Sequence, residues 1–125
     1  MATPIENIGQ LAIRARRLPQ AVAFYRDVLG LEYLFEAGTL AFFMCGDVRL
    51  MLAVPENDAV DHESSTVYFR VADLQAAYAE LADRGASFVD EPHLIAELPD
   101  HDLWMAFFRD PDENLMGLMS EVGRS

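Results

Sequence analysis

The chain repeats one pattern along its length. Residues 10–27 read QLAIRARRLPQAVAFYRD, and residues 66–83 read TVYFRVADLQAAYAELAD. Five positions are identical at this fixed offset, among them Arg14 and Arg70. Each copy starts with residues typical of a strand and then changes to the apolar spacing of an amphipathic helix. Such self-similarity indicates that one supersecondary unit has been duplicated, which restricts the chain to folds built from two similar halves.

Three strands are predicted after each helix, so that each unit has the order βαβββ. Apolar segments of strand length lie at residues 31–37, 39–45 and 48–54 in the first unit and at 86–92, 103–110 and 114–121 in the second. In the turn before the last segment, Glu113 takes the position at which glycine would accept a positive φ most easily. We therefore expect an α+β fold in a single domain over residues 1–125. Its first module covers about residues 5–54, a polar, acidic linker covers 55–65, and the second module covers about 66–121.

The charge of the chain excludes some classes of partner. With 9 Lys and Arg against 21 Asp and Glu, the formal net charge is −12, which repels nucleic acid and anionic membrane surfaces. No apolar run reaches the ~18 residues of a membrane-spanning helix, and the first residues do not have the pattern of a signal peptide. The one cysteine, Cys45, cannot form a disulfide within the chain. We therefore expect a cytoplasmic protein without a nucleic-acid or membrane partner.

Two segments carry a resemblance to a known superfamily. AVAFYRDVLGLEY follows the first predicted strand, and AFFRDPDENLMGLMSE lies near the end of the chain. With the duplicated βαβββ unit, they resemble the vicinal oxygen chelate superfamily, which includes glyoxalases, bleomycin-resistance proteins and extradiol dioxygenases. The resemblance implies that the curved mixed sheets of the two modules form a cup. It also implies a homodimer, because members of this superfamily often complete each cup with strands from both chains.

In metal-using members, four ligands come from the first and last strands of the two modules. The resemblance places these positions at Gln10, Met51, Thr66 and Gly117. An amide, a thioether, a hydroxyl and a glycine lack the imidazole, thiolate or carboxylate donors that zinc, nickel or iron needs. We therefore expect no metal and no cofactor, and we expect Gln10 to hydrogen-bond either a ligand or a neighbouring strand. Gly117 would leave room for a bound molecule or, alternatively, relieve crowding between strands.

Strand alternation predicts which side chains line the cup. The lining is mostly apolar with a few placed polar groups, as in many small-molecule sites. We predict ligand-binding roles for Gln10, Arg14, Leu40, Phe42, Arg49, Met51, Thr66, Tyr68, Arg70, Met105, Phe107 and Gly117. Arg14 and Arg70 would bind a carboxylate or phosphate of the ligand. The alternative is that they form ion pairs with acids at the rim of the cup, such as Glu32 or Glu36.

Two histidines are the candidates for catalysis, and no other catalytic residue is assigned. His93 and His101 flank a long predicted hairpin, and Asp100 and Asp102 lie beside His101. A histidine near carboxylates can act as a general base or as an unorthodox metal ligand. The alternative is that this cluster is simply a polar loop.

Three functions remain open from the sequence. The first is a metal-free protein of the bleomycin-resistance type, which holds a small amphipathic organic molecule, neutral or anionic, in the cup. The second is an enzyme of the glyoxalase, dioxygenase or epimerase type. It would use a shifted metal site, such as Gln10 with His93 or His101, or metal-free acid–base chemistry. The third is a structural or regulatory module that uses the sheets for protein contacts.

Overall fold

The structure, a computed structural model, describes residues 3–55 and 64–123. The first unit consists of β1 (Gln10–Arg14), α1 (Leu18–Ala23), the π-helical segment η1 (Phe24–Val28), β2 (Glu32–Ala37), β3 (Leu40–Cys45) and β4 (Val48–Ala53). The second consists of β5 (Val67–Arg70), α2 (Leu74–Asp83), β6 (Ser87–Phe88), β7 (His93–Glu97), β8 (His101–Arg109) and β9 (Leu115–Gly123). The predicted linker lies mostly outside the described residues, so the module boundaries stay a prediction.

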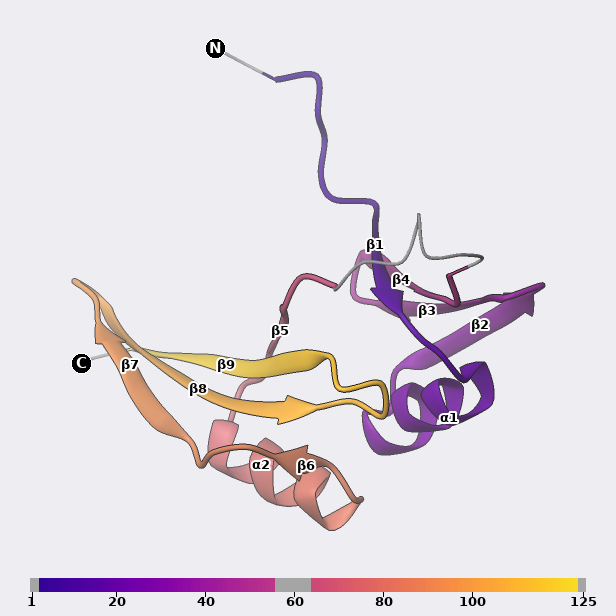
Figure 1. Ribbon diagram of the computed structural model, residues 1–125. Helices are drawn as coiled ribbons and strands as arrows, with labels where there is room; N and C mark the ends of the chain where they lie inside the picture. Colours follow the sequence, from indigo (N-terminus) through magenta and orange to yellow (C-terminus); the bar gives the residue numbers. More distant parts are fainter. Residues whose placement is uncertain (1–2, 56–63, 124–125) are drawn as a thin grey trace.

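The strands form two sheets of the same topology (Figure 1). The first sheet has the order β1-β4-β3-β2, and the second has the order β5-β9-β8-β6, with β7 also pairing with β8. In each sheet the first strand of the unit runs parallel to the last strand, and the other neighbours are antiparallel. The duplicated βαβββ unit and the α+β fold class are therefore confirmed.

Of the strand predicted over residues 86–92, only β6 forms, and the next strand, β7, begins after it at His93. Pro92, at the end of this stretch, has no N–H to donate to a strand ladder. Between the two strands, the Asp90 side chain accepts a hydrogen bond from the backbone N–H of Phe107 at 2.7 Å. A side chain thus takes the place of a backbone acceptor, so pairing with β8 is interrupted between β6 and β7 and the predicted strand is shortened.

The helices begin, and the last turn bends, where local sequence signals indicate. Pro19 lies in the first turn of α1, where its missing N–H leaves no helical hydrogen bond unmade. Asp73 caps α2 by accepting a hydrogen bond from the backbone N–H of Ala76 at 3.1 Å. Glu113 has a φ of 65°, which confirms the predicted left-handed conformation at this turn position. None of the described helices is long and apolar enough to cross a membrane.

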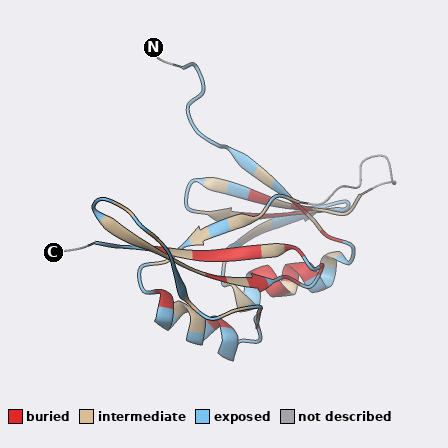
Figure 2. Ribbon diagram, turned by 60° about the vertical axis from the view of Figure 1, so that its left-hand side comes forward, coloured by how far each residue is buried: buried red, intermediate tan, exposed pale blue. Residues whose placement is uncertain are grey.

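Both helices lie on the same side of the sheets, with α1 under the first sheet and α2 under the second (Figure 1). The buried segments gather where helices and strands meet (Figure 2). Tyr25, Phe43 and Phe108 are fully buried and belong to one continuous cluster with residues of both units. The ring centroids of Phe24 and Phe108 are 6.2 Å apart, so η1 of the first unit packs against the second sheet. The two units therefore share one core.

Candidate ligand-binding site

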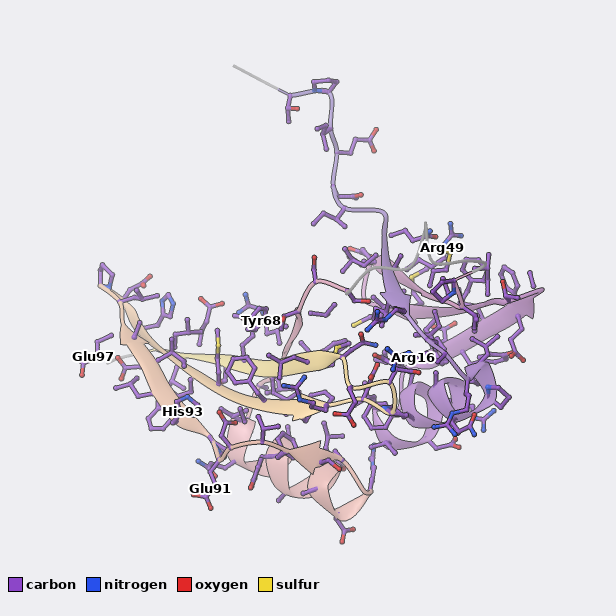
Figure 3. All side chains as sticks on the ribbon, in the orientation of Figure 1. Arg16, Arg49, Tyr68, Glu91, His93 and Glu97 are labelled. Atoms are coloured by element: carbon purple, nitrogen blue, oxygen red, sulfur yellow. The ribbon has the colours of Figure 1, made fainter. Side chains whose placement is uncertain are left out.

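The candidate site consists of two open faces, meaning the sides of the sheets that turn away from α1 and α2. Because directly paired residues share a face, the strand register assigns each one. The open face of the first sheet carries Gln10, Ala12, Arg14, Leu40, Phe42, Met44, Arg49, Met51 and Ala53. The open face of the second carries Tyr68, Arg70, His101, Leu103, Met105, Phe107, Gly117, Met119 and Glu121. Figure 3 shows Arg49 and Tyr68 on the side opposite to the helices. The predicted lining residues within the strands therefore share these faces, and their binding role stays a prediction.

Arg49 is held in place on the open face of the first sheet. Its Nε donates a hydrogen bond to Gln10 Oε1 at 2.6 Å, and its guanidinium carbon lies 5.3 Å from the centre of the Phe42 ring. The amide nitrogen of Gln10 lies 3.6 Å from the sulfur of Met51. Both polar atoms of the Gln10 side chain are thus engaged by β4. Of the two predicted roles for Gln10, a hydrogen bond to a neighbouring strand is the one found within the chain.

Phe35 belongs to the same open face, although the sequence did not indicate it. A β-bulge between Tyr33 and Phe35 brings Phe35 opposite Phe42. The two rings stack with their centroids 4.7 Å apart. Phe42 is buried beneath its neighbours, whereas Phe35 is 48% exposed. Alternation assumes an unbroken strand and therefore cannot place a residue that follows a bulge.

The space beside Gly117 is filled by aromatic rings. A Cβ atom at this position would lie 2.8 Å from Cδ1 of Tyr68 and 3.2 Å from Cε1 of Phe107. These two rings meet edge to face, with their centroids 5.9 Å apart. In this structure the Tyr68 ring takes up the room expected beside Gly117, and a ligand-binding role for Gly117 stays a prediction. Its alternative, relief of crowding between strands, agrees with the structure.

The four positions that correspond to metal ligands do not fit a catalytic divalent metal. Gln10 Oε1 already accepts a hydrogen bond from Arg49, and that positive charge would repel a cation. Gly117 brings no donor, and Met51 brings only a thioether. Thr66 lies just ahead of β5 and lines a polar pocket of about 250 Å³ at the junction of the units. In residues 3–55 and 64–123, no group of three or more His, Cys, Asp or Glu side chains could hold a metal ion.

Arg14 and Arg70, which the repeat aligns, have different surroundings. Arg14 lines the same polar pocket as Thr66 and takes part in interactions of its own. Arg70 forms an ion pair with Glu121 on the open face of the second sheet. For Arg70, the predicted alternative of an ion pair with an acid is therefore found.

His101 belongs to a chain of charged groups on the open face of the second sheet. Its Nδ1 lies 2.6 Å from Asp100 Oδ1, and its Nε2 lies 2.9 Å from Glu121 Oε2, whose other oxygen binds Arg70. A neutral imidazole carries a single N–H, so His101 can donate to both carboxylates only when it is protonated. Glu121 was not among the predicted site residues, although its parity with Gly117 along the last strand places it on the same face.

His93 has other partners than His101. Its Nδ1 lies 2.8 Å from the backbone oxygen of Glu91 and 3.7 Å from Asp90 Oδ2. No described contact joins either histidine to Gln10. The shifted metal site considered from the sequence is therefore not assembled by the contacts of this chain.

The contact between Asp100 and His101 can be tested by measuring the pKa of Asp100 in solution. The hydrogen bond from His101 holds the pKa of Asp100 below the usual value for an aspartate. A pKa lowered in the folded state means that the pair stabilises the fold above the usual aspartate pKa, and that this contribution is lost as the pH falls through the lowered value. We expect His101→Gln to return the pKa of Asp100 to its usual range, measured by carbon NMR of the side-chain carboxyl group. His93→Gln is the control and should leave the pKa of Asp100 unchanged. The contact would be disproved if the pKa of Asp100 were the same in the unaltered protein, in His101→Gln and in His93→Gln.

A buried polar network joins the two units. Asp110, which is 3% exposed, accepts hydrogen bonds from the Tyr25 hydroxyl at 2.7 Å and from the backbone N–H groups of Asp112 and Asn114, both at 2.9 Å. Burial, followed by the charge of Asp110, raises the pKa of Tyr25 well above its usual value, so the hydroxyl remains a donor.

Two more bonds connect this network to the end of β1. Asn114 Nδ2 donates to the backbone oxygen of Arg14, and the backbone N–H of Arg16 donates to Asp112 Oδ1, both at 2.7 Å. The network therefore fixes the first sheet relative to the β8–β9 turn. The turn itself is predictable from the sequence, but the burial of the Asp110 carboxylate is not, because its partner Tyr25 is distant along the chain.

Comparison with known proteins agrees with this architecture. Uncharacterized protein YraH from Bacillus subtilis (strain 168) is 27% identical over 124 residues, which cover 86% of this chain and 92% of that protein. The crystal structure of lactoylglutathione lyase from Agrobacterium tumefaciens is 25% identical, with a TM-score of 0.72, and covers 94% of this chain and 95% of its own. The structure of TnmS3, an antibiotic binding protein from Streptomyces sp. CB03234, is 23% identical, with a TM-score of 0.75, and covers 96% of this chain and 99% of its own.

A family model settles which superfamily these likenesses represent. Residues 7–118, nearly the whole chain, match the model described as Glyoxalase/Bleomycin resistance protein/Dioxygenase superfamily. The match includes most of both units and, apart from residues 119–121, both segments that carried the resemblance. The chain therefore belongs to the glyoxalase/bleomycin resistance protein/dioxygenase superfamily, the vicinal oxygen chelate superfamily that its sequence resembles.

Proposed function

We propose that this chain is a metal-free binding protein, which holds a small amphipathic organic molecule on the open faces of its sheets. The observation that carries the proposal is the state of the family's metal positions. Gln10 is engaged by Arg49 and Met51, and the space at Gly117 is filled by Tyr68. What remains on the open faces is apolar and aromatic surface with a few fixed polar groups, which suits an amphipathic molecule.

The fold alone does not show whether this chain only binds a molecule or also catalyses a reaction. Among proteins of this architecture, one is named a lactoylglutathione lyase and another an antibiotic binding protein. Function therefore has to be argued from the site. The donor set described above favours binding over metal-dependent lyase or dioxygenase chemistry.

We also propose that a second copy of the chain covers the open faces. Residues 3–9 run away from both sheets (Figure 1), and in this segment Ile5 is 73% exposed and Ile8 is 61% exposed. Phe35 and Tyr68, one on each open face, are 48% and 46% exposed. Exposed apolar surface is typical of contact sites where it is contiguous, as it would become between two copies of the chain. A two-fold dimer would bury it on both chains at once, and sedimentation should then give twice the chain mass of 14.0 kDa.

The proposal is tested by thermal unfolding in the presence of amphipathic organic molecules. A ligand present at about 100 times its Kd stabilises the folded state by roughly 2.7 kcal/mol, which raises Tm by several degrees. Ala12→Trp places a large ring on the open face of the first sheet and should abolish this shift. Ala79→Trp makes the same change on the exposed side of α2 and should leave the shift intact. A shift that survives Ala12→Trp would place the ligand elsewhere.

Metal content tests the other half of the proposal. After incubation with zinc, nickel, manganese or ferrous iron and removal of the excess, elemental analysis should find well below one metal ion per chain. A stoichiometric metal would contradict the proposal and would direct attention to His93 and His101.

A second candidate function is metal-free acid–base catalysis. The observation that favours it is His101, which lies on the open face between two carboxylates. In this reading His101→Gln would abolish turnover of a bound molecule without changing its affinity. In a pure binding protein no turnover exists to be lost.

A further inference from the structure

We infer that Arg49 anchors the anionic group of an aromatic ligand, and that Gln10 is the residue that positions it. The inference rests on the proposed function and names the chemical class of its ligand. The ligand would be a molecule with a flat apolar ring system that carries a carboxylate, sulfonate or similar anion.

The first support is the way in which Arg49 is fixed. Its Nε is used by Gln10, so both Nη groups remain as the two-pronged donor that fits a carboxylate or sulfonate. The Phe42 ring supports the guanidinium from one side at 5.3 Å. Within the described part of the chain, Arg49 forms no ion pair. A guanidinium held on two sides loses little freedom when an anion binds, and such pre-organisation increases affinity.

The second support is the apolar surface beside the charge. Phe35 stacks on Phe42, at 30° between the ring planes, and leaves almost half of its own surface exposed. Phe42 lies on β3, between Phe35 on β2 and Arg49 on β4, so a ligand ring placed against Phe35 would extend across Phe42 to bring its anion to Arg49. Aromatic rings in offset contact add roughly 0.5–1.5 kcal/mol beyond the burial of their surface. The pairing of an exposed ring with a fixed cation therefore selects for a molecule that is both aromatic and anionic.

The third support is that the two arginines predicted from the repeat have other contacts. Arg70 is neutralised by Glu121, and Arg14 lies at the other end of β1 in a separate polar pocket with interactions of its own. The net charge of −12 opposes an anion at long range. Exposed charges more than about 8 Å away are largely screened at physiological ionic strength, so the local contact decides.

The test compares two fluorescent dyes that share one ring system. Anilinonaphthalene sulfonate carries an anion, and phenyl naphthylamine is its uncharged parent. Titration of the native protein with each dye gives two dissociation constants. We expect Arg49→Gln to weaken binding of the sulfonate roughly tenfold or more and to change binding of the uncharged dye by less than about twofold. Arg26→Gln, which alters an exposed arginine of η1 outside both open faces, is the matched control and should change neither constant by more than about twofold.

Two further variants separate positioning from direct contact. Gln10→Leu should weaken the sulfonate dye while the uncharged dye binds as before. Gln10→Glu should weaken it at least as much, because a carboxylate beside Arg49 neutralises the charge. A Gln10 with a merely structural role would affect both dyes equally.

The outcomes distinguish this inference from the proposed function. If neither dye binds the unaltered protein, the proposed binding function fails and the inference fails with it. If both dyes bind and Arg49→Gln changes neither constant, or weakens both equally, the inference is wrong while the binding function stands. Loss of sulfonate binding alone in Arg49→Gln, with binding of both dyes unchanged in Arg26→Gln, establishes the anchor.

Discussion

Replacing Asp110 with alanine is expected to lower the free energy of unfolding by about 3–5 kcal/mol. The carboxylate is buried and accepts bonds from a hydroxyl, two backbone N–H groups and the Asn114 amide. Removing it leaves the Tyr25 hydroxyl and the two backbone N–H groups without this acceptor in a largely buried site, and each unsatisfied buried group costs about 1–3 kcal/mol. Urea unfolding followed by circular dichroism gives the value.

Two matched variants show whether the cost arises in this network. Tyr25→Phe removes one of the bonds and keeps the ring in the core, so it should cost about 1–2 kcal/mol. Asp83→Ala removes an exposed acid at the end of α2 and should stay within about 0.5 kcal/mol of the parent. A loss below about 1 kcal/mol in Asp110→Ala would mean that the network does not hold the two units together. Because it fixes β1 relative to the β8–β9 turn, Asp110→Ala should also weaken ligand binding on the open faces.

Gly117→Ala is expected to lower the free energy of unfolding by about 1–3 kcal/mol, the usual cost of forcing an extra methyl group into a filled space. The new Cβ would lie 2.8 Å from Cδ1 of Tyr68, which is closer than two carbon atoms can approach. The Tyr68 ring must then leave its edge-to-face contact with Phe107. Gly123→Ala, in the same strand, is the control because nothing lies within 4 Å of its Cβ position.

A double-mutant cycle identifies the cause of this loss. With Tyr68→Ala in place, the clash is gone and Gly117→Ala should cost almost nothing. If the cost is the same in both backgrounds, strain in the backbone of β9 rather than the Tyr68 ring is responsible. The cycle also bears on function, because the Tyr68 ring occupies the space beside Gly117, the position that the resemblance assigns to a metal ligand in metal-using members.

Much of the fold could be predicted from the sequence because the signals are local or periodic. The repeat at a fixed offset gave the two βαβββ units, and Pro19 and Asp73 marked the helix starts. Alternation along each strand also gave the correct partners around the last turn, where Phe107 lies opposite Gly117. The predictions that were wrong or missing depend on irregularities. The bulge before Phe35 and the break between β6 and β7 each change which residue faces which way.

The candidate site was less predictable, because its polar contacts join residues that are distant along the chain. Gln10 and Arg49, Arg70 and Glu121, and Tyr25 and Asp110 are each brought together only by pairing and packing. The sequence could name arginines on the open faces. It could not show that Arg70 is neutralised by an acid, whereas Arg49 is fixed by Gln10 with its Nη groups available to an anion.

The sequence by itself thus determined the duplicated unit, its α+β fold class and the absence of ordinary metal donors at the family's ligand positions. These follow from residue identity, from periodicity and from the chemistry of single side chains. Only the tertiary structure decided that Tyr68 fills the space at Gly117, that Asp110 joins the units, and that Gln10 accepts a hydrogen bond from Arg49. Those outcomes depend on distances of a few ångströms between separate strands, and short-range interactions of this kind have no counterpart in the order of residues along the chain.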